Sequence, residues 1–368
     1  MGIKRAIISG GGTGGHIFPA IAIANRIKLE NPDAEILFIG AEGKMEMEKV
    51  PAAGYKIEGL WISGFQRRLT IKNLMLPFKI IGSMLKARGI IKKFKPDVVI
   101  GVGGYASGPT LKVAAQLGIP TVIQEQNSFP GKTNKLLAAK VSKICVAYEG
   151  LDRFFPKNKI EMTGNPVRED VVQIEGKRAE AFSFFGLDSN KKTVFIVGGS
   201  LGARTLNESI KNQLDFFADN NIQLIWQCGK FHIESLKSEL GNDLPQGIVL
   251  TDFISRMDYA YAAADIIISR AGAIAVSELC LIGKPIILVP SPNVAEDHQT
   301  KNAMALVDKN AAILVKDVES RNSLVPLMVE LLENAEKRKE LSIQISKMAI
   351  HEADAKIVKV INEVLKSA

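Results

Sequence analysis

The residues near the start of the chain that are best suited to chemistry are a histidine and the glycines before it. The segment AIISGGGTGGHIFPA begins at Ala6 and leads from an apolar stretch through five glycines to His16. Glycine has no Cβ and reaches positive φ easily, so its backbone N–H groups can approach a ligand closely. Pro19 and the apolar residues after it are typical of a helix, whose N-terminus favours negative charge. The segment therefore predicts an anion-binding loop with a functional histidine beside it.

The same glycines allow a different interpretation. Gly10, Gly12 and Gly15 have the spacing of the dinucleotide-binding fingerprint, which also needs an acidic residue at the end of the next strand. Residues 36–39 are the apolar residues of that strand, and Gly40 follows them. The missing acid disfavours a nicotinamide-dependent dehydrogenase. For His16, the alternative to a functional role is a capping or packing role.

Polar and glycine-rich loops also follow apolar strands in the second half of the chain. Residues 269–278 place Glu278 on a helix after such a loop, where its carboxylate could accept both hydroxyls of a ribose. A solvated helix charge is the alternative. Residues 290–302 form a long loop rich in groups that bind sugar hydroxyls, and Gln299 and Asn302 would share one helix face.

Two absent patterns restrict the chemistry. The chain contains no Asp-x-Asp pair, which metal-dependent nucleotide-sugar enzymes commonly use, and no Gly-Lys-Ser/Thr of the Walker type. The charge of a leaving diphosphate would then be met by helix N-termini, glycine-loop amides, Ser200 and Arg168. We therefore expect chemistry without a metal. The three cysteines and four histidines have no metal-ligand spacing.

Apolar strands alternate with helices along the whole chain, which predicts an α/β fold with parallel sheets covered on both faces. The expected strands and helices include 35–39, 44–53, 72–94, 97–101, 110–117, 120–124, 193–197, 203–214, 223–226, 248–250, 265–268 and 285–288. At 368 residues the chain suits two doubly wound domains facing across a cleft. Residues 1–163 would form the first and 164–351 the second. The last helix, about 352–368, would pack back on the first.

The net charge of +8 is concentrated in one region. Residues 66–95 contain nine Lys or Arg and no acid, which leaves 38 basic and 39 acidic residues elsewhere. This asymmetry indicates a local anionic partner and disfavours general nucleic-acid binding. The sequence shows neither a membrane-spanning run nor a signal peptide, so a cytoplasmic protein is expected.

The basic region also contains an apolar tip and an apolar stripe. Ile80, Met84, Ala87, Ile91 and Phe94 recur at helical spacing next to lysines. The stripe could simply pack on the sheet. The tip instead predicts shallow insertion into an anionic bilayer. The predicted membrane residues are Leu74, Met75, Leu76, Phe78, Lys79 and Lys86.

Taken together, the motifs resemble the MurG family of bacterial transferases, which add N-acetylglucosamine to the lipid-linked muramyl-pentapeptide precursor of peptidoglycan. The resemblance covers nearly the whole chain. The motifs that carry it are GGTGGHIFPA at 11–20, GVGGYASGP at 101–109, EQN at 125–127, GNPVR at 164–168, GGSLGA at 198–203, SRAGAIAVSE at 269–278 and HQTKNA at 298–303.

This resemblance implies the two-domain GT-B architecture, with the acceptor in the N-terminal domain and the donor, UDP-N-acetylglucosamine, in the C-terminal one. It implies no cofactor and a peripheral location on the cytoplasmic face of the cell membrane. On the acceptor side it implicates Gly103, Gly104 and Tyr105. The donor positions that it implies are Thr13, Gly14, Gly15, Asn127, Arg168, Ser200, Ile254, Ala273, Ile274, Ala275, Val276, Ser277, Glu278 and Gln299.

The resemblance leaves the general base open. The family often has histidine before Glu-Gln-Asn, whereas this chain has Gln124, so His16 and Glu125 are the catalytic candidates. The expected reaction is an inverting transfer to the C4 hydroxyl of the muramyl sugar. Alternatives are a UDP-N-acetylglucosamine epimerase on the same fold and a catalytically inactive nucleotide-sugar binder.

Overall fold

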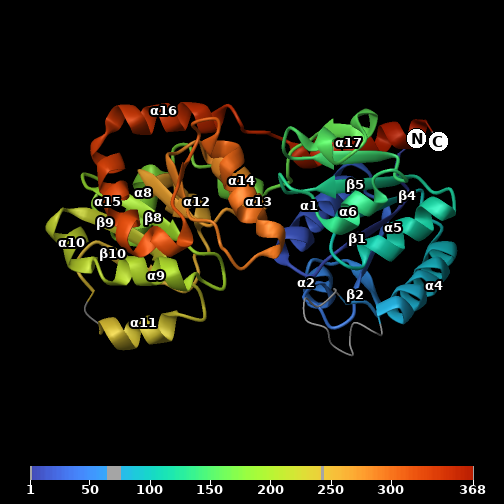
Figure 1. The fold of residues 1–368 in the computed structure, drawn as a ribbon, viewed down its shortest axis with the longest axis horizontal. Helices are drawn as coiled ribbons and strands as arrows, with labels where there is room; N and C mark the ends of the chain where they lie inside the picture. Colours follow the sequence, from blue (N-terminus) through green and yellow to red (C-terminus); the bar gives the residue numbers. More distant parts are fainter. Residues whose placement is uncertain (1, 64–75, 242–243, 368) are drawn as a thin grey trace. The chain divides into compact units, whose positions relative to one another are not determined.

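The computed structural model of the chain describes residues 2–63, 76–241 and 244–367 (Figure 1). The chain forms two compact units, which we call the N-terminal unit (Met1–Val167 and His351–Ala368) and the C-terminal unit (Arg168–Ile350). It passes from one unit to the other between Val167 and Arg168, whereas the sequence placed the boundary between residues 163 and 164.

The described part of the N-terminal unit contains a parallel sheet of seven strands in the order β3-β2-β1-β4-β5-β6-β7. Its central strands are apolar and buried because helices cover both faces. The strands are β1 (Arg5–Gly10), β2 (Glu35–Ala41), β3 (Lys56–Leu60), β4 (Val98–Gly103), β5 (Thr121–Glu125), β6 (Lys143–Val146) and β7 (Ile160–Met162). The α-helices are α1 (Gly14–Glu30), α2 (Glu46–Ala52), α4 (Leu76–Phe94), α5 (Ser107–Gln116), α6 (Lys132–Leu137) and α17 (Ala353–Lys366).

The C-terminal unit repeats this plan with six parallel strands in the order β10-β9-β8-β11-β12-β13 among its described residues. The strands are β8 (Lys192–Val197), β9 (Ile222–Gln227), β10 (Ile248–Thr251), β11 (Ile266–Ser269), β12 (Ile286–Leu288) and β13 (Ile313–Leu314). The α-helices are α7 (Glu169–Val172), α8 (Arg178–Phe185), α9 (Arg204–Lys211), α10 (Leu214–Asp219), α11 (Ile233–Leu240), α12 (Met257–Ala263), α13 (Ala273–Ile282), α14 (His298–Val307), α15 (Ser320–Glu333) and α16 (Ala335–Ser346).

Each sheet has one point where the strand order reverses, and this point explains where the loops gather. In the N-terminal unit β1 lies between β2 and β4, so the loops after β1 and β4 leave the sheet side by side. In the C-terminal unit β8 lies between β9 and β11. Parallel α/β sheets bind ligands beside such reversals, at the carboxyl ends of the strands. The reversals bring together the two glycine loops of the first unit, and the loops 198–202 and 269–278 of the second.

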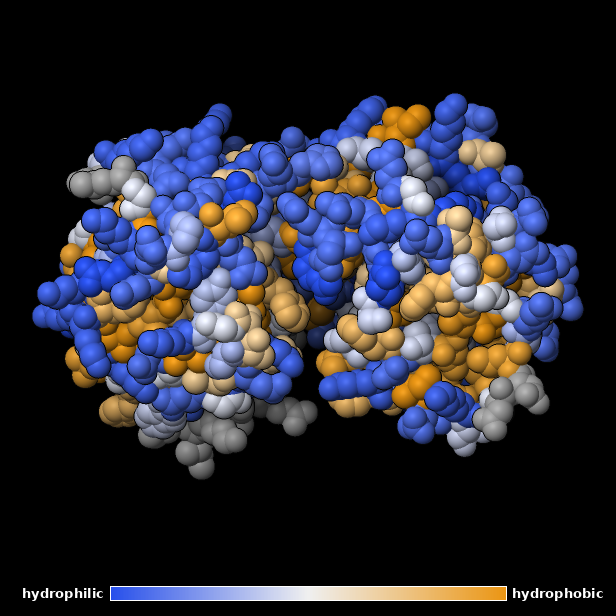
Figure 2. Space-filling model, turned by 180° about the vertical axis from the view of Figure 1, so that it is seen from behind, coloured by the Kyte–Doolittle hydropathy of each residue, from blue (hydrophilic) through white to orange (hydrophobic). Residues whose placement is uncertain are grey.

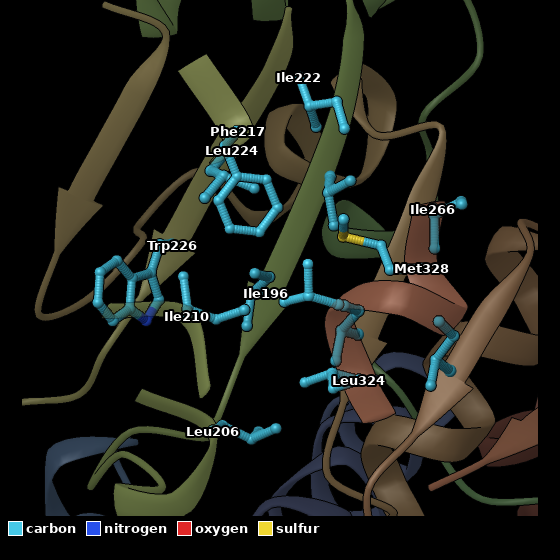
Figure 3. Packing of buried hydrophobic residues seen from close by; sticks show 14 of the residues in the cluster. Ile196, Leu206, Ile210, Phe217, Ile222, Leu224, Trp226, Ile266, Leu324 and Met328 are labelled. Atoms are coloured by element: carbon cyan, nitrogen blue, oxygen red, sulfur yellow. The ribbon is translucent and has the colours of Figure 1, made fainter. Parts of the chain in front are cut away.

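The core of the C-terminal unit shows how the apolar pattern supports these loops. Figure 3 shows Phe217 from α10 and Met328 from α15 packed near strand residues such as Ile196. Trp226 on β9 is fully buried, and its indole N–H donates to Asn207 Oδ1 at 3.0 Å. The buried tryptophan therefore keeps a partner for its one polar group, as a dry core requires.

The final helix α17 belongs to the N-terminal unit although it follows the C-terminal unit in sequence. It packs against α1 and β6, and its Ile357 and Ile361 are buried in one cluster with Ile27 of α1. Its apolar residues recur every three or four positions, so one face of the helix is covered.

Candidate functional site

His16 lies in the first turn of α1, directly after the first glycine loop, and the second glycine loop packs against its ring. Gly103 ends β4 with φ at +102°, and a Cβ there would lie 2.7 Å from His16 Cδ2. A Cβ on Gly104 would lie 2.4 Å from the carbonyl oxygen of Gly11. Side chains at either position would push the loops apart. The two loops can therefore pack this closely only because positions 103 and 104 are glycine, and they hold the imidazole between them.

The hydrogen bonds of His16 identify which ring nitrogen carries the proton. Nδ1 lies 3.0 Å from the carbonyl oxygen of Gly11 and 3.4 Å from Thr13 Oγ1. A carbonyl oxygen can only accept, so Nδ1 donates and carries the hydrogen when the ring is neutral. Nε2 is then the basic nitrogen, and a neutral imidazole in this tautomer can take a proton from a hydroxyl.

A buried carboxylate that sequence reasoning missed braces the first glycine loop from behind. Glu46, in the first turn of α2, is 1% exposed. Its Oε2 accepts from the N–H of Gly12 at 2.8 Å, and its Oε1 accepts from the N–H of Ala41 at 3.0 Å. The amide of Gly12 therefore points into the protein and does not serve a ligand. Sequence reasoning missed this role because nothing in the sequence distinguishes Glu46 from any other glutamate at the start of a helix.

Glu125, the other catalytic candidate, holds its own loop in place. It is 2% exposed at the end of β5. One carboxylate oxygen accepts from the backbone and side-chain amides of Asn127 at 3.0 and 3.3 Å, and the other from Gly131 N–H at 3.1 Å and Asn134 Nδ2 at 2.8 Å. A carboxylate has about four acceptor positions, and these four bonds use them. The geometry favours a structural role for Glu125 over proton transfer.

Gln124, where the family often has histidine, also has a structural role. Gln124 is fully buried on β5, and its side-chain amide donates to Asn165 Oδ1 at 2.8 Å. Asn165 in turn donates to the carbonyl oxygen of Gln126 at 3.0 Å. These bonds attach the GNPVR segment to the end of β5, so the side chain of Gln124 is used within the protein.

In the C-terminal unit the loop 198–202 follows β8 and exposes Ser200. Gly202 has φ at +87°, and a Cβ there would lie 2.1 Å from the carbonyl oxygen of Cys228. The loop is therefore held tightly against the loop after β9, where Lys230 N–H donates to the carbonyl oxygen of Ser200 at 3.3 Å. Ser200 itself is exposed, as a phosphate contact requires.

Glu278 lies in the second turn of α13, the helix that follows β11. The residue is partly buried, and desolvation of the carboxylate raises its pKa to about 7. Arg168 attracts the ionised form, and the hydroxyl of Tyr261 lies 3.5 Å from Glu278 Oε2. A partly buried carboxylate with few hydrogen-bond donors around it has capacity to accept hydrogen bonds from the hydroxyls of a ligand. Tyr261, on α12, was not identified from the sequence.

Two predicted donor residues use part of their hydrogen-bonding capacity within the protein. The N–H of Ile254 donates to Gln227 Oε1 at 3.0 Å, so a backbone contact of Ile254 with uracil would use its carbonyl oxygen. Gln299 Oε1 accepts from Ser291 N–H at 2.8 Å. Asn302 is buried and donates to the carbonyl oxygen of Ala271 at 3.2 Å, which joins α14 to the loop before α13.

The remaining predicted residues divide between the two units. Thr13, Asn127 and Tyr105 lie on loops of the N-terminal unit, with Tyr105 48% exposed, whereas Gly14 and Gly15 form the start of α1. Arg168 opens the C-terminal unit and forms an ion pair with Asp170 at 2.5 Å. Positions 273–277 form the start of α13, after Gly272.

The described residues contain no group of three or more His, Cys, Asp or Glu side chains arranged to hold a metal. Among them no helix is both long and apolar enough to span a bilayer.

The predicted membrane surface is only partly described. Leu74 and Met75 lie outside the described residues, and α4 begins at Leu76. Ala87 and Ile91 are buried against the sheet, so that part of the stripe packs. Ile80 is instead 39% exposed, because the buried face begins one turn later, at Ser83.

The outer face of α4 carries exposed apolar side chains. Phe78, Ile81 and Leu85 are 66%, 58% and 67% exposed, at helical spacing. Trp61, at the end of β3, is 50% exposed, and Lys79 Nζ lies 5.1 Å from its ring centroid. We call these four apolar residues the α4 patch. Exposed hydrophobic residues also form separate patches on the face drawn in Figure 2, so exposure alone does not define a binding surface.

Lys86 of the basic region pairs with an acid from outside that region. Its Nζ lies 2.9 Å from Glu42 Oε1, a residue outside the run 66–95. Both side chains are about half exposed, so the pair contributes little to stability. It does reduce the local positive charge.

The fold identifies the class of protein. With a TM-score of 0.71, the chain matches the crystal structure of CalG4, the calicheamicin glycosyltransferase, at 14% identity and 99% coverage of both chains. Two parallel-sheet domains of this kind are the GT-B glycosyltransferase fold. Residues 6–146 match the glycosyltransferase family 28 N-terminal domain, and residues 193–360 match the family 28 C-terminal domain. The chain belongs to glycosyltransferase family 28.

Relatives within this family are similar over nearly their whole length. A protein of Flavobacterium psychrophilum is 55% identical over 363 residues, which is 99% of this chain and 98% of the relative. It is named UDP-N-acetylglucosamine–N-acetylmuramyl-(pentapeptide) pyrophosphoryl-undecaprenol N-acetylglucosamine transferase. The crystal structure of Acinetobacter baumannii MurG matches with a TM-score of 0.77 at 28% identity, over 98% of this chain and 99% of that one.

Proposed function

We propose that this chain transfers N-acetylglucosamine from UDP-N-acetylglucosamine to a lipid-linked N-acetylmuramyl-pentapeptide, in peptidoglycan synthesis. The observation that carries the proposal is the identity of 55% with a transferase of that name across both units. The two units also hold complementary chemistry: a histidine between glycine loops in one, and a partly buried carboxylate after a glycine loop in the other.

The proposed reaction is a single displacement that inverts the anomeric carbon. The C4 hydroxyl oxygen of the muramyl sugar forms a bond to C1 of N-acetylglucosamine, and the bond from C1 to the diphosphate oxygen breaks. His16 Nε2 takes the hydroxyl proton, and the electron pair leaves with UDP. A β-1,4 linkage results. Glu125 is the less favoured base because its acceptor positions are used within its loop.

The residues of the C-terminal unit hold the donor in this proposal. Glu278 accepts hydrogen bonds from the two ribose hydroxyls. These bonds replace the hydrogen bonds to water that the carboxylate loses on folding. Ser200, Arg168 and the N-terminus of α13 meet the charge of the diphosphate, the helix through its exposed N–H groups. Gln299 donates from its amide nitrogen to a sugar hydroxyl while its oxygen remains bound to the loop.

Supply of the lipid-linked acceptor tests this function against its alternatives. UDP release from UDP-N-acetylglucosamine should require the acceptor, because the displacement needs its C4 hydroxyl. An epimerase would convert the donor sugar without any acceptor, and an inactive binder would release no UDP. Either result would overturn the proposal. Chromatography of the nucleotide products distinguishes the three outcomes.

We further propose that the α4 patch places the N-terminal unit on an anionic membrane surface at the cytoplasmic face. The support is an exposed apolar stripe within a region of nine cations, which suits shallow insertion between charged headgroups. Each Lys or Arg near such a surface contributes about 1 kcal/mol, less at high salt. Trp61 extends the surface with a side chain suited to an interface.

Serine substitutions in this patch should separate membrane binding from catalysis. We expect the triple variant Phe78→Ser, Ile81→Ser and Leu85→Ser to bind phosphatidylglycerol vesicles roughly tenfold or more weakly, because each buried large apolar side chain contributes about 1.5–3 kcal/mol. Turnover of a short-chain soluble acceptor should be retained. Leu29→Ser, at a residue 72% exposed on α1, is the matched control. Vesicle sedimentation that is insensitive to salt and to the triple substitution would contradict the proposal.

A further inference from the structure

We propose that Glu46 is a positioning residue for His16 and acts through the single peptide group that joins Gly11 to Gly12. The proposal rests on the proposed function, in which His16 takes the proton of the acceptor hydroxyl. It assigns a role in the reaction to a buried carboxylate on α2 that does not itself contact a substrate.

One side of this peptide group binds the carboxylate. The N–H of Gly12 donates to Glu46 Oε2 at 2.8 Å. The second oxygen, Oε1, accepts from Ala41 N–H at 3.0 Å, at the end of β2. Because β2 pairs with β1 in the sheet, the carboxylate is anchored to the same rigid layer that leads into the glycine loop.

The other side of the same peptide group binds the imidazole. The carbonyl oxygen of Gly11 lies 3.0 Å from His16 Nδ1. The N–H of Gly12 and the C=O of Gly11 belong to one planar, resonance-coupled amide. A negative charge on the N–H side increases the negative charge on the oxygen, because hydrogen bonds in a chain polarise one another. The bond to Nδ1–H therefore becomes stronger.

This arrangement has two chemical consequences. It keeps the proton of a neutral ring on Nδ1 and so leaves Nε2 as the base, and it stabilises the imidazolium that forms when Nε2 takes a proton. A carboxylate bound directly to a histidine has the same two effects in the Ser-His-Asp triad. Here one peptide group separates the carboxylate from the ring, so we expect a smaller effect.

The surrounding backbone is shaped around the carboxylate. A Cβ on Gly11 would lie 2.2 Å from Glu46 Oε1, and a Cβ on Gly40 would lie 2.6 Å from Glu46 Cγ. Both positions admit only glycine while Glu46 stays where it is. A carboxylate behind an anion-binding loop also opposes an anionic ligand and takes the Gly12 amide from it. A neutral side chain would brace the loop without that cost, which favours a role for the charge.

The ring also contacts neighbours on both glycine loops. Gly11 and Thr13 come from the first loop, and Gly103 comes from the end of β4. From α2 the group that acts on the ring, through the peptide group of Gly11 and Gly12, is Glu46. The carboxylate is therefore the group to change when the tautomer of His16 is followed.

Nitrogen-15 NMR of histidine-labelled protein tests the proposal in the full chain, which has four histidines. His16→Asn assigns the His16 signals, and spectra are recorded at a pH where the ring is neutral. The wild type should show His16 mainly protonated at Nδ1. Glu46→Gln, which has one acceptor atom where glutamate has two, should shift the ring towards a mixture of tautomers. Its kcat should fall roughly tenfold or more, the cost typical of removing a group that orients a functional histidine. Its KM for the donor should stay within about twofold, since the residues proposed to hold the nucleotide, such as Glu278 and Ser200, lie in the C-terminal unit.

Glu48→Gln is the matched control, because Glu48 lies on the same helix, its side chain is 78% exposed, and its ion pair is with the adjacent Lys49. Gly11→Ala is a second variant that keeps the carboxylate but displaces it, and it should change the tautomer in the same direction. A folded Glu46→Gln protein with an unchanged His16 tautomer would overturn the proposal, as would an equal change in Glu48→Gln. A wild type that transfers no sugar would contradict the proposed function, and the tautomer measurement would still decide the link to Glu46.

Discussion

Replacement of His16 by alanine is expected to lower turnover by roughly 10²–10⁴-fold, the usual contribution of one proton-transfer group. Affinity for UDP should stay nearly unchanged, because the residues proposed to hold the nucleotide lie in the C-terminal unit. The measurement combines UDP release with a short-chain acceptor and calorimetric titration of UDP. His351→Ala is the matched control, since this histidine is exposed outside α17.

A variant of Glu125 tests the other candidate for the general base. Glu125→Gln replaces one acceptor oxygen by a donor and leaves the amides of its loop without a partner, so thermal stability should fall. Buried polar groups left unpaired cost about 1–3 kcal/mol each. Turnover lost in proportion to folded protein would agree with a structural role. Near-normal turnover in folded His16→Ala together with a large loss in folded Glu125→Gln would reverse the assignment of the base.

Much of the fold could be predicted because parallel sheets require near-continuous apolar strands. Segments such as 193–197 and 265–268 were predicted within one residue of β8 and β11. The pattern was insufficient where strands are very short: β7 and β13 bury too few residues to stand out from loops. The helix expected at 203–214 is α9, which ends at Lys211, and a separate helix, α10, begins at Leu214.

The candidate site shows a similar division. Glycine loops are visible in sequence because only glycine allows backbones to approach as Gly104 and Gly11 do. The partners of the loops are not visible, because Glu46 and Tyr261 reach them through the fold from distant segments. Sequence also assigns chemistry to groups that the fold uses otherwise. Gln299 and Ile254 each bond within the protein, and Glu125 is saturated by neighbours that only the loop conformation brings near.

The ribose role of Glu278 leads to a prediction on donor binding. Glu278→Gln should weaken binding of UDP-N-acetylglucosamine by about 1–3 kcal/mol, the cost of imperfectly paired hydroxyls in a site. In the wild type this affinity should rise as the pH passes upward through about 7, because the ionised carboxylate accepts both hydroxyls. The intact donor is the better probe, since UDP itself has a terminal phosphate that titrates near pH 6. The Glu278→Gln variant should lack this pH dependence.

The same substitution should stabilise the protein at alkaline pH. The folded-state pKa of about 7 lies above the ordinary value of 4.5, so folding favours the protonated acid. The resulting penalty is absent below pH 4.5, grows between the two values and is complete above pH 7. A shift of this size corresponds to about 3 kcal/mol at most. Glu278→Gln, which is neutral at every pH, should therefore unfold at higher denaturant concentration than the wild type at about pH 8, and at the same concentration near pH 4.

Glu340→Gln on the exposed surface of α16 is the control, because its carboxylate is solvated and its loss should change the unfolding free energy by a few tenths of a kcal/mol. A Glu278→Gln variant that is less stable than the wild type at alkaline pH would contradict the ribose role. It would show that the carboxylate already has its hydrogen-bond partners within the protein. Weaker donor binding combined with greater stability would instead identify a carboxylate whose burial is tolerated for the sake of the ligand. That combination is the expected sign of a binding group, because a structural one loses stability when it is removed.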